Sequence, residues 1–158
     1  MFDLSGLTQA RKIKSYKRLS PFIRMDVSLI HTHIRENLPN IILKRHKPFN
    51  GEVNKASCIY AYLPKGNDGL LWFTRIDEEN ICLFLSLNDS FDIHEVTPID
   101  IMFHPDLCIS KGSLYDATIL EAKTIIVKNV YVFRGSSCID LPNPSILTLL
   151  KQSVTDFI

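Results

Sequence analysis

The stretch that decides the fold is residues 69–87, "GLLWFTRIDEENICLFLSL". It contains two runs rich in branched aliphatic and aromatic residues, 69–76 and 80–87, and such residues favour β-strands. The polar residues "DEEN" (77–80) have the length of a hairpin connection. The stretch therefore predicts two antiparallel strands joined by a tight turn.

Further runs of the same kind lie on both sides of this hairpin. They are "SCIYAYL" (57–63), "DIHEVTPIDIMF" (92–103), "SLYDATIL" (113–120) and "TIIVKNVYVF" (124–133). "PKGNDG" (64–69) has the composition of a tight hairpin turn between the first of these runs and the strand at 69–76. Short strands separated by turn residues predict a mainly antiparallel sheet.

One helix is expected before the sheet and one after it. In "MDVSLIHTHIRENLPN", Asp26 is suited to the N-cap position and Pro39 ends the apolar periodicity. In "NPSILTLLKQSVTDFI", Asn143 or Ser145 is expected to cap the second helix. The apolar residues at helical spacing are Val27, Ile30, Ile34, Leu38, Ile146, Leu149, Leu150 and Val154. The predicted fold class is α+β, a mainly antiparallel β-sheet core flanked by an N-terminal and a C-terminal helix.

Size and composition favour one compact domain. The 158 residues are 46% hydrophobic and 22% charged, which suits a single core. Residues 1–20 lack periodicity and are predicted to be a basic N-terminal arm, with 21–158 as a single α+β domain. No apolar run approaches the ~20 residues of a membrane span, and the first residues carry charges where a signal peptide has its apolar core. A soluble intracellular protein, of the cytoplasm or nucleus, is expected.

The net charge of +1 hides an asymmetry along the chain. Residues 1–55 carry +7 and residues 56–158 carry −6. Either the basic segments pack on the acidic remainder or lie in solvent, or they form a surface that binds the phosphates of RNA. The candidate phosphate-binding residues are Lys12, Lys14, Lys17, Arg18, Lys44, Arg45 and Lys47.

The four cysteines, Cys58, Cys82, Cys108 and Cys138, are widely spaced. None forms the close pair that zinc ribbons and redox motifs need. Each lies in or beside an apolar run, where cysteine behaves as a small hydrophobic residue. They are expected to be reduced and mostly buried.

The histidines do not form a recognisable metal or catalytic motif. His31 and His33 are two residues apart, so on a helix they point about 200° apart and cannot bind one ion together. His94 and His104 have acidic neighbours in sequence, which permits a metal or acid–base site without indicating one. The chain also has no Gly-rich phosphate loop, nucleophile elbow or HExxH string. Neither a cofactor nor a metal is expected.

Trp72, the single tryptophan, has two interpretations. On a central strand it is expected to be a core residue, and the alternative is a platform on which a base or ring stacks. In the alternative, Trp72, Tyr115 and Asp116 line a ligand pocket. Strand alternation places Phe73 and Arg75 on the face opposite Trp72.

Several of these strands follow one another in an order known from one enzyme superfamily. "KASCIYAYL", "GLLWFTRIDEENICLFL", "KGSLYDATIL" and "KTIIVKNVYVFRG" resemble core strands of the covalent nucleotidyltransferases, which comprise mRNA capping enzymes and ATP-dependent ligases. The resemblance covers about residues 50–140 and is nearest to small, divergent capping-enzyme-like proteins of large DNA viruses. It puts Asp116 at an acidic motif position, Asn129 where aspartate is usual, and Gly135 at the end of a motif.

The same resemblance implies that catalysis has been lost. Lys55 stands where the family has its nucleophile, but "ASC" follows it in place of x-D-G, and only 23 residues remain after Gly135 for the later motifs. We therefore expect no enzyme activity. The resemblance implies a non-catalytic interaction or assembly protein, contacting protein partners or further copies of itself, in a virion or virus factory. The alternative is an RNA- or cap-binding module. Asp116 is then a structural residue facing Lys111 or the Gly112 turn, or a ligand contact.

Overall fold

The structure is a computed structural model in which residues 26–41, 65–120 and 124–158 are described. It is α+β, as the sequence predicts. Six strands form one antiparallel sheet in the order β3-β2-β1-β4-β5-β6, with one helix near each end of the described chain. The strands are β1 (Asn67–Ile76), β2 (Glu79–Leu87), β3 (Ile93–Ile99), β4 (Ser113–Ile119), β5 (Ile125–Phe133) and β6 (Ser136–Ser137). The strand expected at 57–63 and the arm at 1–20 lie outside the described residues.

The β1–β2 hairpin confirms the opening prediction. Its connection is shorter than "DEEN", because Ile76 pairs directly with Glu79 and leaves a two-residue turn. Both turn residues, Asp77 and Glu78, have positive φ angles, 46° and 66°. Two consecutive positive φ angles are the geometry of a type I′ turn, whose twist matches that of the flanking strands.

Strand β1 begins earlier than the sequence predicts. Asn67, Asp68 and Gly69 belong to the strand and pair with β4, whereas the prediction put them in a hairpin turn. Pairing with β4 overrides the turn-like composition of these residues. Glycine is needed at position 69, because a Cβ there would collide with the Leu85 carbonyl oxygen. The missing side chain thus lets β1 and β2 approach closely. Asp68 therefore lies on the sheet, paired with Thr118 of β4.

Strand β3 ends before the predicted boundary. It stops at Ile99, not near 103, and the chain then forms the short 3₁₀-helix η3 (Pro105–Cys108). The backbone N–H of Asp106 donates to His104 Nδ1 at 3.2 Å, which satisfies the first turn of η3. Because β3 is an edge strand, Pro98 is tolerated within it.

The two helices agree with the periodicity, but only one cap does. Helix α1 (Val27–Asn37) starts after Asp26, whose carboxylate accepts the Ser28 N–H at 3.0 Å. Helix α2 (Asn143–Asp156) has Pro142 at its N-cap and no side-chain cap, so the expected caps Asn143 and Ser145 are wrong. Asn143 and Ser145 both lie inside the first turn of α2. Proline is tolerated in this turn because the backbone N–H groups of a helix's first turn have no helical partner.

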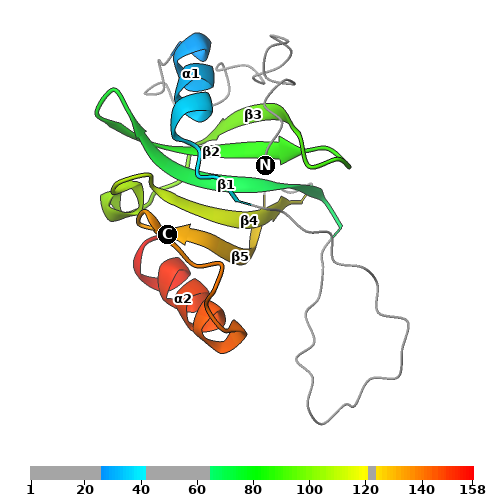
Figure 1. The fold of residues 1–158 in the computed structure, drawn as a ribbon, viewed down its shortest axis with the longest axis vertical. Coiled ribbons are helices and arrows are strands. Elements are labelled where there is room, and N and C mark those ends of the chain that lie inside the picture. Colours follow the sequence, from blue (N-terminus) through cyan, green and yellow to red (C-terminus); the bar gives the residue numbers. More distant parts are fainter. Residues whose placement is uncertain (1–25, 42–64, 121–123) are drawn as a thin grey trace.

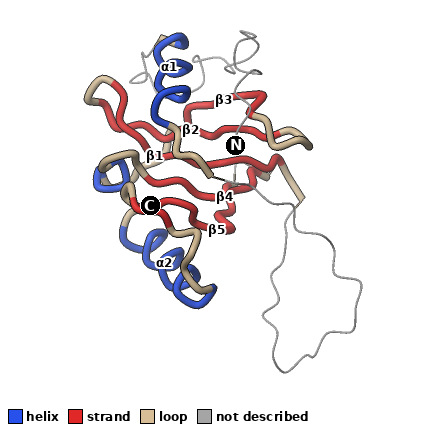
Figure 2. The backbone as a smooth tube through the Cα atoms, viewed as in Figure 1, coloured by secondary structure: helices blue, strands red, loops and turns tan. Residues whose placement is uncertain are grey.

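The sheet separates two hydrophobic cores, one under α1 and one under α2. Figures 1 and 2 show the sheet between the two helices. Successive side chains of a strand point to opposite faces, so Trp72 lies on the α1 face and Phe73 on the α2 face, as predicted. The buried residues of the α1 face include Ile30, Ile34, Leu70, Trp72, Leu83, Leu85, Ile93 and Leu114. Those of the α2 face include Leu71, Phe73, Cys82, Phe84, Leu107, Tyr115, Ala117 and Val130.

The cysteines that the structure describes agree with the prediction. Cys82, Cys108 and Cys138 are buried free thiols, and Cys58 lies outside the described residues. Burial raises the pKa of Cys82 well above its ordinary value and that of Cys108 to about 11. These thiols are therefore protonated at neutral pH. Within the described ranges, no helix is long and apolar enough to cross a membrane.

Candidate functional site

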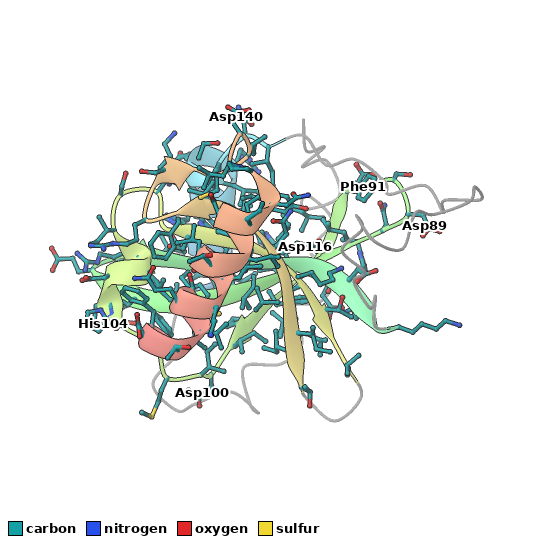
Figure 3. All side chains as sticks on the ribbon, turned by 90° about the horizontal axis from the view of Figure 1, so that it is seen from below. Asp89, Phe91, Asp100, His104, Asp116 and Asp140 are labelled. Atoms are coloured by element: carbon teal, nitrogen blue, oxygen red, sulfur yellow. The ribbon has the colours of Figure 1, made fainter. Side chains whose placement is uncertain are left out.

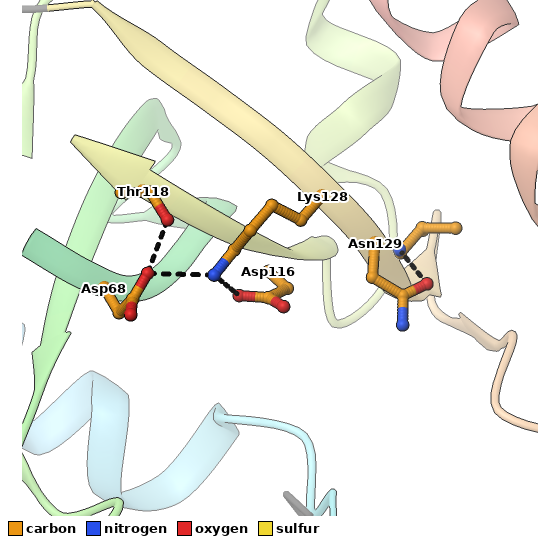
Figure 4. Close-up of polar contacts among 6 residues, drawn as sticks. Asp68, Asp116, Thr118, Lys128 and Asn129 are labelled. Atoms are coloured by element: carbon orange, nitrogen blue, oxygen red, sulfur yellow. Dashed lines mark hydrogen bonds and ion pairs between the residues drawn. The ribbon is translucent and has the colours of Figure 1, made fainter. Parts of the chain in front are cut away.

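A polar cluster on the α1 face of the sheet surrounds Lys128. It consists of Asp68, Asp116, Thr118 and Lys128, and we call it the Lys128 cluster (Figure 4). Asp68 alternates with Leu70 along β1, and Asp116 alternates with Leu114 along β4. Because both leucines belong to the α1-side core, both carboxylates point to that face.

A β-bulge positions Lys128. Asn129 pairs with Asp116 and Val127 pairs with Ala117, so β5 holds one more residue than β4 at this point, and that residue is Lys128. Bulges of this kind redirect a side chain and often occur at functional sites. The Val130 N–H is satisfied by the Oδ1 of Asn129 at 2.9 Å, which stabilises the irregular backbone.

The lysine bridges two carboxylates from two different strands. Its Nζ lies 2.9 Å from Asp68 Oδ1 and 3.1 Å from Asp116 Oδ1. Thr118 Oγ1 also donates a hydrogen bond to Asp68 Oδ1. The Lys128 and Asp116 side chains are 18% and 24% exposed, whereas Asp68 is 63% exposed. The cluster is therefore sheltered at its centre and open at Asp68.

The electrostatics of the cluster keep the lysine charged. Burial alone lowers the pKa of Lys128, but the hydrogen bonds and charges of Asp68 and Asp116 outweigh it, and the net pKa is raised. Burial likewise raises the pKa of Asp68, and the hydrogen bonds from Thr118 and Lys128 reverse this to a net decrease. A nucleophilic lysine needs a depressed pKa, so this geometry favours a structural ion pair over covalent catalysis.

The amino-acid sequence points to only part of this cluster. The sequence pattern predicts Lys111 or the Gly112 turn as the partner of Asp116, whereas the structure pairs Asp116 with Lys128. The turn-like composition around Asp68 gives no sign that this residue belongs to the cluster. The two residues of the family-like motifs, Asp116 and Asn129, are Cα partners across β4 and β5. Lys55 lies outside the described residues.

The pocket proposed from Trp72, Tyr115 and Asp116 does not form. Trp72 and Tyr115 are both fully buried and lie on opposite faces of the sheet. The Trp72 indole N–H donates to the Lys111 carbonyl oxygen at 3.0 Å, and burial raises the pKa of Tyr115 to about 12. The core interpretation of Trp72 is thus confirmed.

The seven candidate phosphate-binding residues lie outside the described residues, so the structure neither joins nor separates them.

His104 serves as the cap of η3 and lies 3.6 Å from the Asp106 carboxylate. The described part of the chain contains no group of three or more His, Cys, Asp or Glu side chains that could bind a metal ion.

His33 joins α1 to the sheet. Its ring stacks on Trp72 with centroids 5.2 Å apart, and its Nε2 lies 2.9 Å from Thr74 Oγ1. The amide of Asn37 lies 3.2 Å from Nδ1 and donates to it, so Nδ1 is an acceptor and Nε2 carries the hydrogen. The packed ring is therefore the neutral tautomer.

The stability of the protein is expected to fall as the pH falls below 6.5, in part because of His33. Burial lowers the pKa of His33, while the nearby charges of Glu36 and Asp77 act in the opposite direction. As the pH falls, His33 therefore takes up a proton in the unfolded chain before it does so in the folded chain. The contribution of the neutral ring to stability is complete above pH 6.5 and is lost as the pH falls through the pKa of the folded state. Urea unfolding of the wild type and of His33→Gln over this range measures the difference, and identical pH slopes would contradict it.

Replacing Lys128 with methionine is expected to destabilise the protein by about 1–2 kcal/mol at neutral pH, because two carboxylates then face each other without a cation. The loss should shrink in acid, where the carboxylates are protonated. Urea unfolding at neutral and acidic pH measures both effects. Lys151→Met, at an exposed lysine of α2, is the control, and an equal loss in the two variants would show that the cluster contributes nothing.

The α2 side of the molecule carries a different kind of surface. Leu147, Val154 and Ile158 are 50%, 50% and 41% exposed. Leu147 and Val154 are seven residues apart on α2 and therefore lie on the same side of the helix, and Ile158, which follows the end of the helix, lines the same groove as Val154. Beside them is an open groove of about 460 Å³. The groove is lined by Leu71, Ile101, Ile125, Ile126, Val127, Val154 and Ile158.

Comparisons of this chain with protein-family models, with curated proteins and with solved structures found no match. The site must therefore be interpreted from its own chemistry.

Proposed function

We propose that this chain is a non-catalytic assembly protein that associates with further copies of itself through the α2 face. The observation that carries the proposal is the apolar stripe of Leu147, Val154 and Ile158 beside an aliphatic groove. Exposed apolar residues that gather beside a groove are typical of protein interaction sites.

The chemistry of the Lys128 cluster supports the non-catalytic part of this proposal. Its lysine has a raised pKa and two carboxylate partners, so it is held as a cation. In this proposal, the likeness to capping enzymes and ligases reflects a shared scaffold of viral origin. The protein acts inside the cell, and its sheet has been retained for binding other proteins.

Light scattering coupled to size exclusion, over a series of protein concentrations, tests the proposal. The wild type is expected to self-associate, and Leu147→Glu combined with Val154→Glu is expected to yield a monomer with unchanged circular dichroism. The matched control carries glutamate at Gln152 and Thr155, which are exposed on the same helix. A wild type that stays monomeric at every concentration would contradict the proposal.

RNA or cap binding is the competing function. Gel-shift assays with capped and uncapped RNA at low and high salt examine it, since phosphate contacts weaken steeply with salt. A salt-sensitive shift that disappears when Lys12, Lys14, Lys17 and Arg18 are changed to glutamate, in a protein that stays monomeric, would favour this alternative.

A further inference from the structure

We propose that the bulge at Lys128 keeps the outer edge of β5 from pairing with a strand of another chain. An unpaired edge strand is a template for edge-to-edge aggregation, and bulges and charged side chains are features that natural proteins use against it. This protection is independent of the association proposed above, which uses side chains of α2.

Strand β5 has the composition of a segment that aggregates when its edge is unpaired. Residues 125–133, "IIVKNVYVF", contain neither proline nor glycine, and Lys128 is their only charged residue. Segments of about six or seven β-branched and aromatic residues with low charge form cross-β fibrils. Strand β5 therefore needs protection wherever its backbone can reach another chain.

The bulges shorten the part of this edge that another strand could use. Among the described residues, β5 has a second strand neighbour only at Val132 and Phe133, where it pairs with β6. Two register shifts against β4 leave Lys128 and Tyr131 as extra residues. The longest regular run outside the β6 pairing is thus residues 125–127. An ordinary strand has about five or six residues, so this run is a poor template for pairing.

Two consecutive polar residues enforce the bulge. In a regular strand Lys128 and Asn129 would point to opposite faces, so one of them would enter the apolar α2-side core. With Asn129 paired to Asp116, a regular register would make Lys128 face Ala117, which is fully buried in that core. Burying the ammonium group there would be costly. The bulge instead lets Lys128 reach Asp116 and Asp68 on the α1 face.

The positions of the register shifts in the described sheet agree with a protective role. Strand β1 pairs with β2 and with β4 without a shift, whereas the outer pairings, β3 with β2 and β5 with β4, both contain shifts. In β3 the extra residue is His94, and Pro98 removes a backbone donor. Figure 3 shows the two regions apart, with Asp116 opposite the β5 bulge and Asp89 on the turn that leads into β3.

The substitution Lys128→Val in the full chain tests the protection. Valine can face Ala117 in the apolar core, so β5 can pair regularly and the regular run on its edge grows to residues 125–130. Lys128→Val is expected to form thioflavin-positive aggregates roughly tenfold faster than the wild type, with a fibre reflection at about 4.7 Å. Lys128→Arg keeps the cation and is expected to aggregate as slowly as the wild type.

The matched control for lost stability is Trp72→Phe. Removing the cation of Lys128 also destabilises the protein, and Trp72→Phe is expected to destabilise it to a similar extent without touching β5 or its ion pairs. If Lys128→Val aggregates no faster than Trp72→Phe, general destabilisation explains the aggregation and the protective role is wrong.

A double variant separates the bulge from the charge. Val127→Lys combined with Lys128→Val keeps the composition of the strand, but the lysine and Asn129 then occupy alternate positions and can both point to the α1 face without a bulge. The double variant is expected to aggregate as fast as Lys128→Val although it retains a lysine. Circular dichroism shows whether each variant folds, and the double variant decides the question if Lys128→Val does not fold. A double variant as slow as the wild type would overturn the proposal, because the charge alone would then protect the edge.

Discussion

Replacing Trp72 with alanine is expected to lower the free energy of unfolding by about 4 kcal/mol. The side chain is fully buried, stacks on His33 and donates to the Lys111 carbonyl oxygen. Its removal leaves a cavity between α1 and the sheet and an acceptor without its donor. Thermal unfolding followed by circular dichroism should show Tm lower by roughly 8–16 °C for a chain of this size.

The variant Trp72→Phe separates packing from hydrogen bonding. Phenylalanine keeps most of the buried volume but cannot donate to Lys111, so a loss of about 1–2 kcal/mol is expected. If Trp72→Ala and Trp72→Phe lower the free energy of unfolding by the same amount, the apolar contacts of the indole do not stabilise the protein as the structure implies.

Replacing Gly112 with alanine is expected to lower the free energy of unfolding by about 2–5 kcal/mol. Gly112 has a φ of +80°, a region that costs an ordinary residue about 1–2 kcal/mol. A Cβ there would also collide with the carbonyl oxygen of Phe73, which belongs to the backbone of β1 and can yield only if strands shift. Overpacking of this kind typically adds about 1–3 kcal/mol. Urea unfolding measures the loss.

The neighbouring substitution Lys111→Ala is the control for Gly112→Ala. Lys111 is exposed, and its contact with Trp72 uses the backbone carbonyl, so a change within about 0.5 kcal/mol is expected. A Gly112→Ala variant as stable as Lys111→Ala would mean that the turn before β4 can rearrange freely.

The local pattern of the sequence was sufficient for much of the fold. Two runs of aliphatic and aromatic residues around a polar turn identify the β1–β2 hairpin, and Asp26 followed by helical spacing identifies α1. These features depend on contacts between near neighbours, such as the Asp26 carboxylate with the Ser28 N–H. Interactions of this range are visible in a short window of sequence.

Element boundaries required the tertiary structure. Asn67 to Gly69 have turn-like composition, yet pairing with β4 extends β1 through them. Strand β3 ends at Ile99, and η3 follows although the residues after Ile99 look strand-like. In each case contacts with residues far along the chain outweigh propensities that are worth less than about 1 kcal/mol per residue.

Some residues of the candidate site could likewise be predicted from the sequence, and others required the tertiary structure. Sequence alone identified Asp116 as a residue of interest and Trp72 as a core residue, because an acidic residue within a strand and a lone tryptophan between apolar neighbours are visible locally. Only the fold brought Lys128 between Asp116 and Asp68, which are 48 positions apart, through one bulge and three adjacent strands. Strand alternation also separated Tyr115 from Trp72, since neighbouring strands in register place such residues on opposite faces. A local pattern determines which residues favour a strand, and register between distant strands determines which side chains meet.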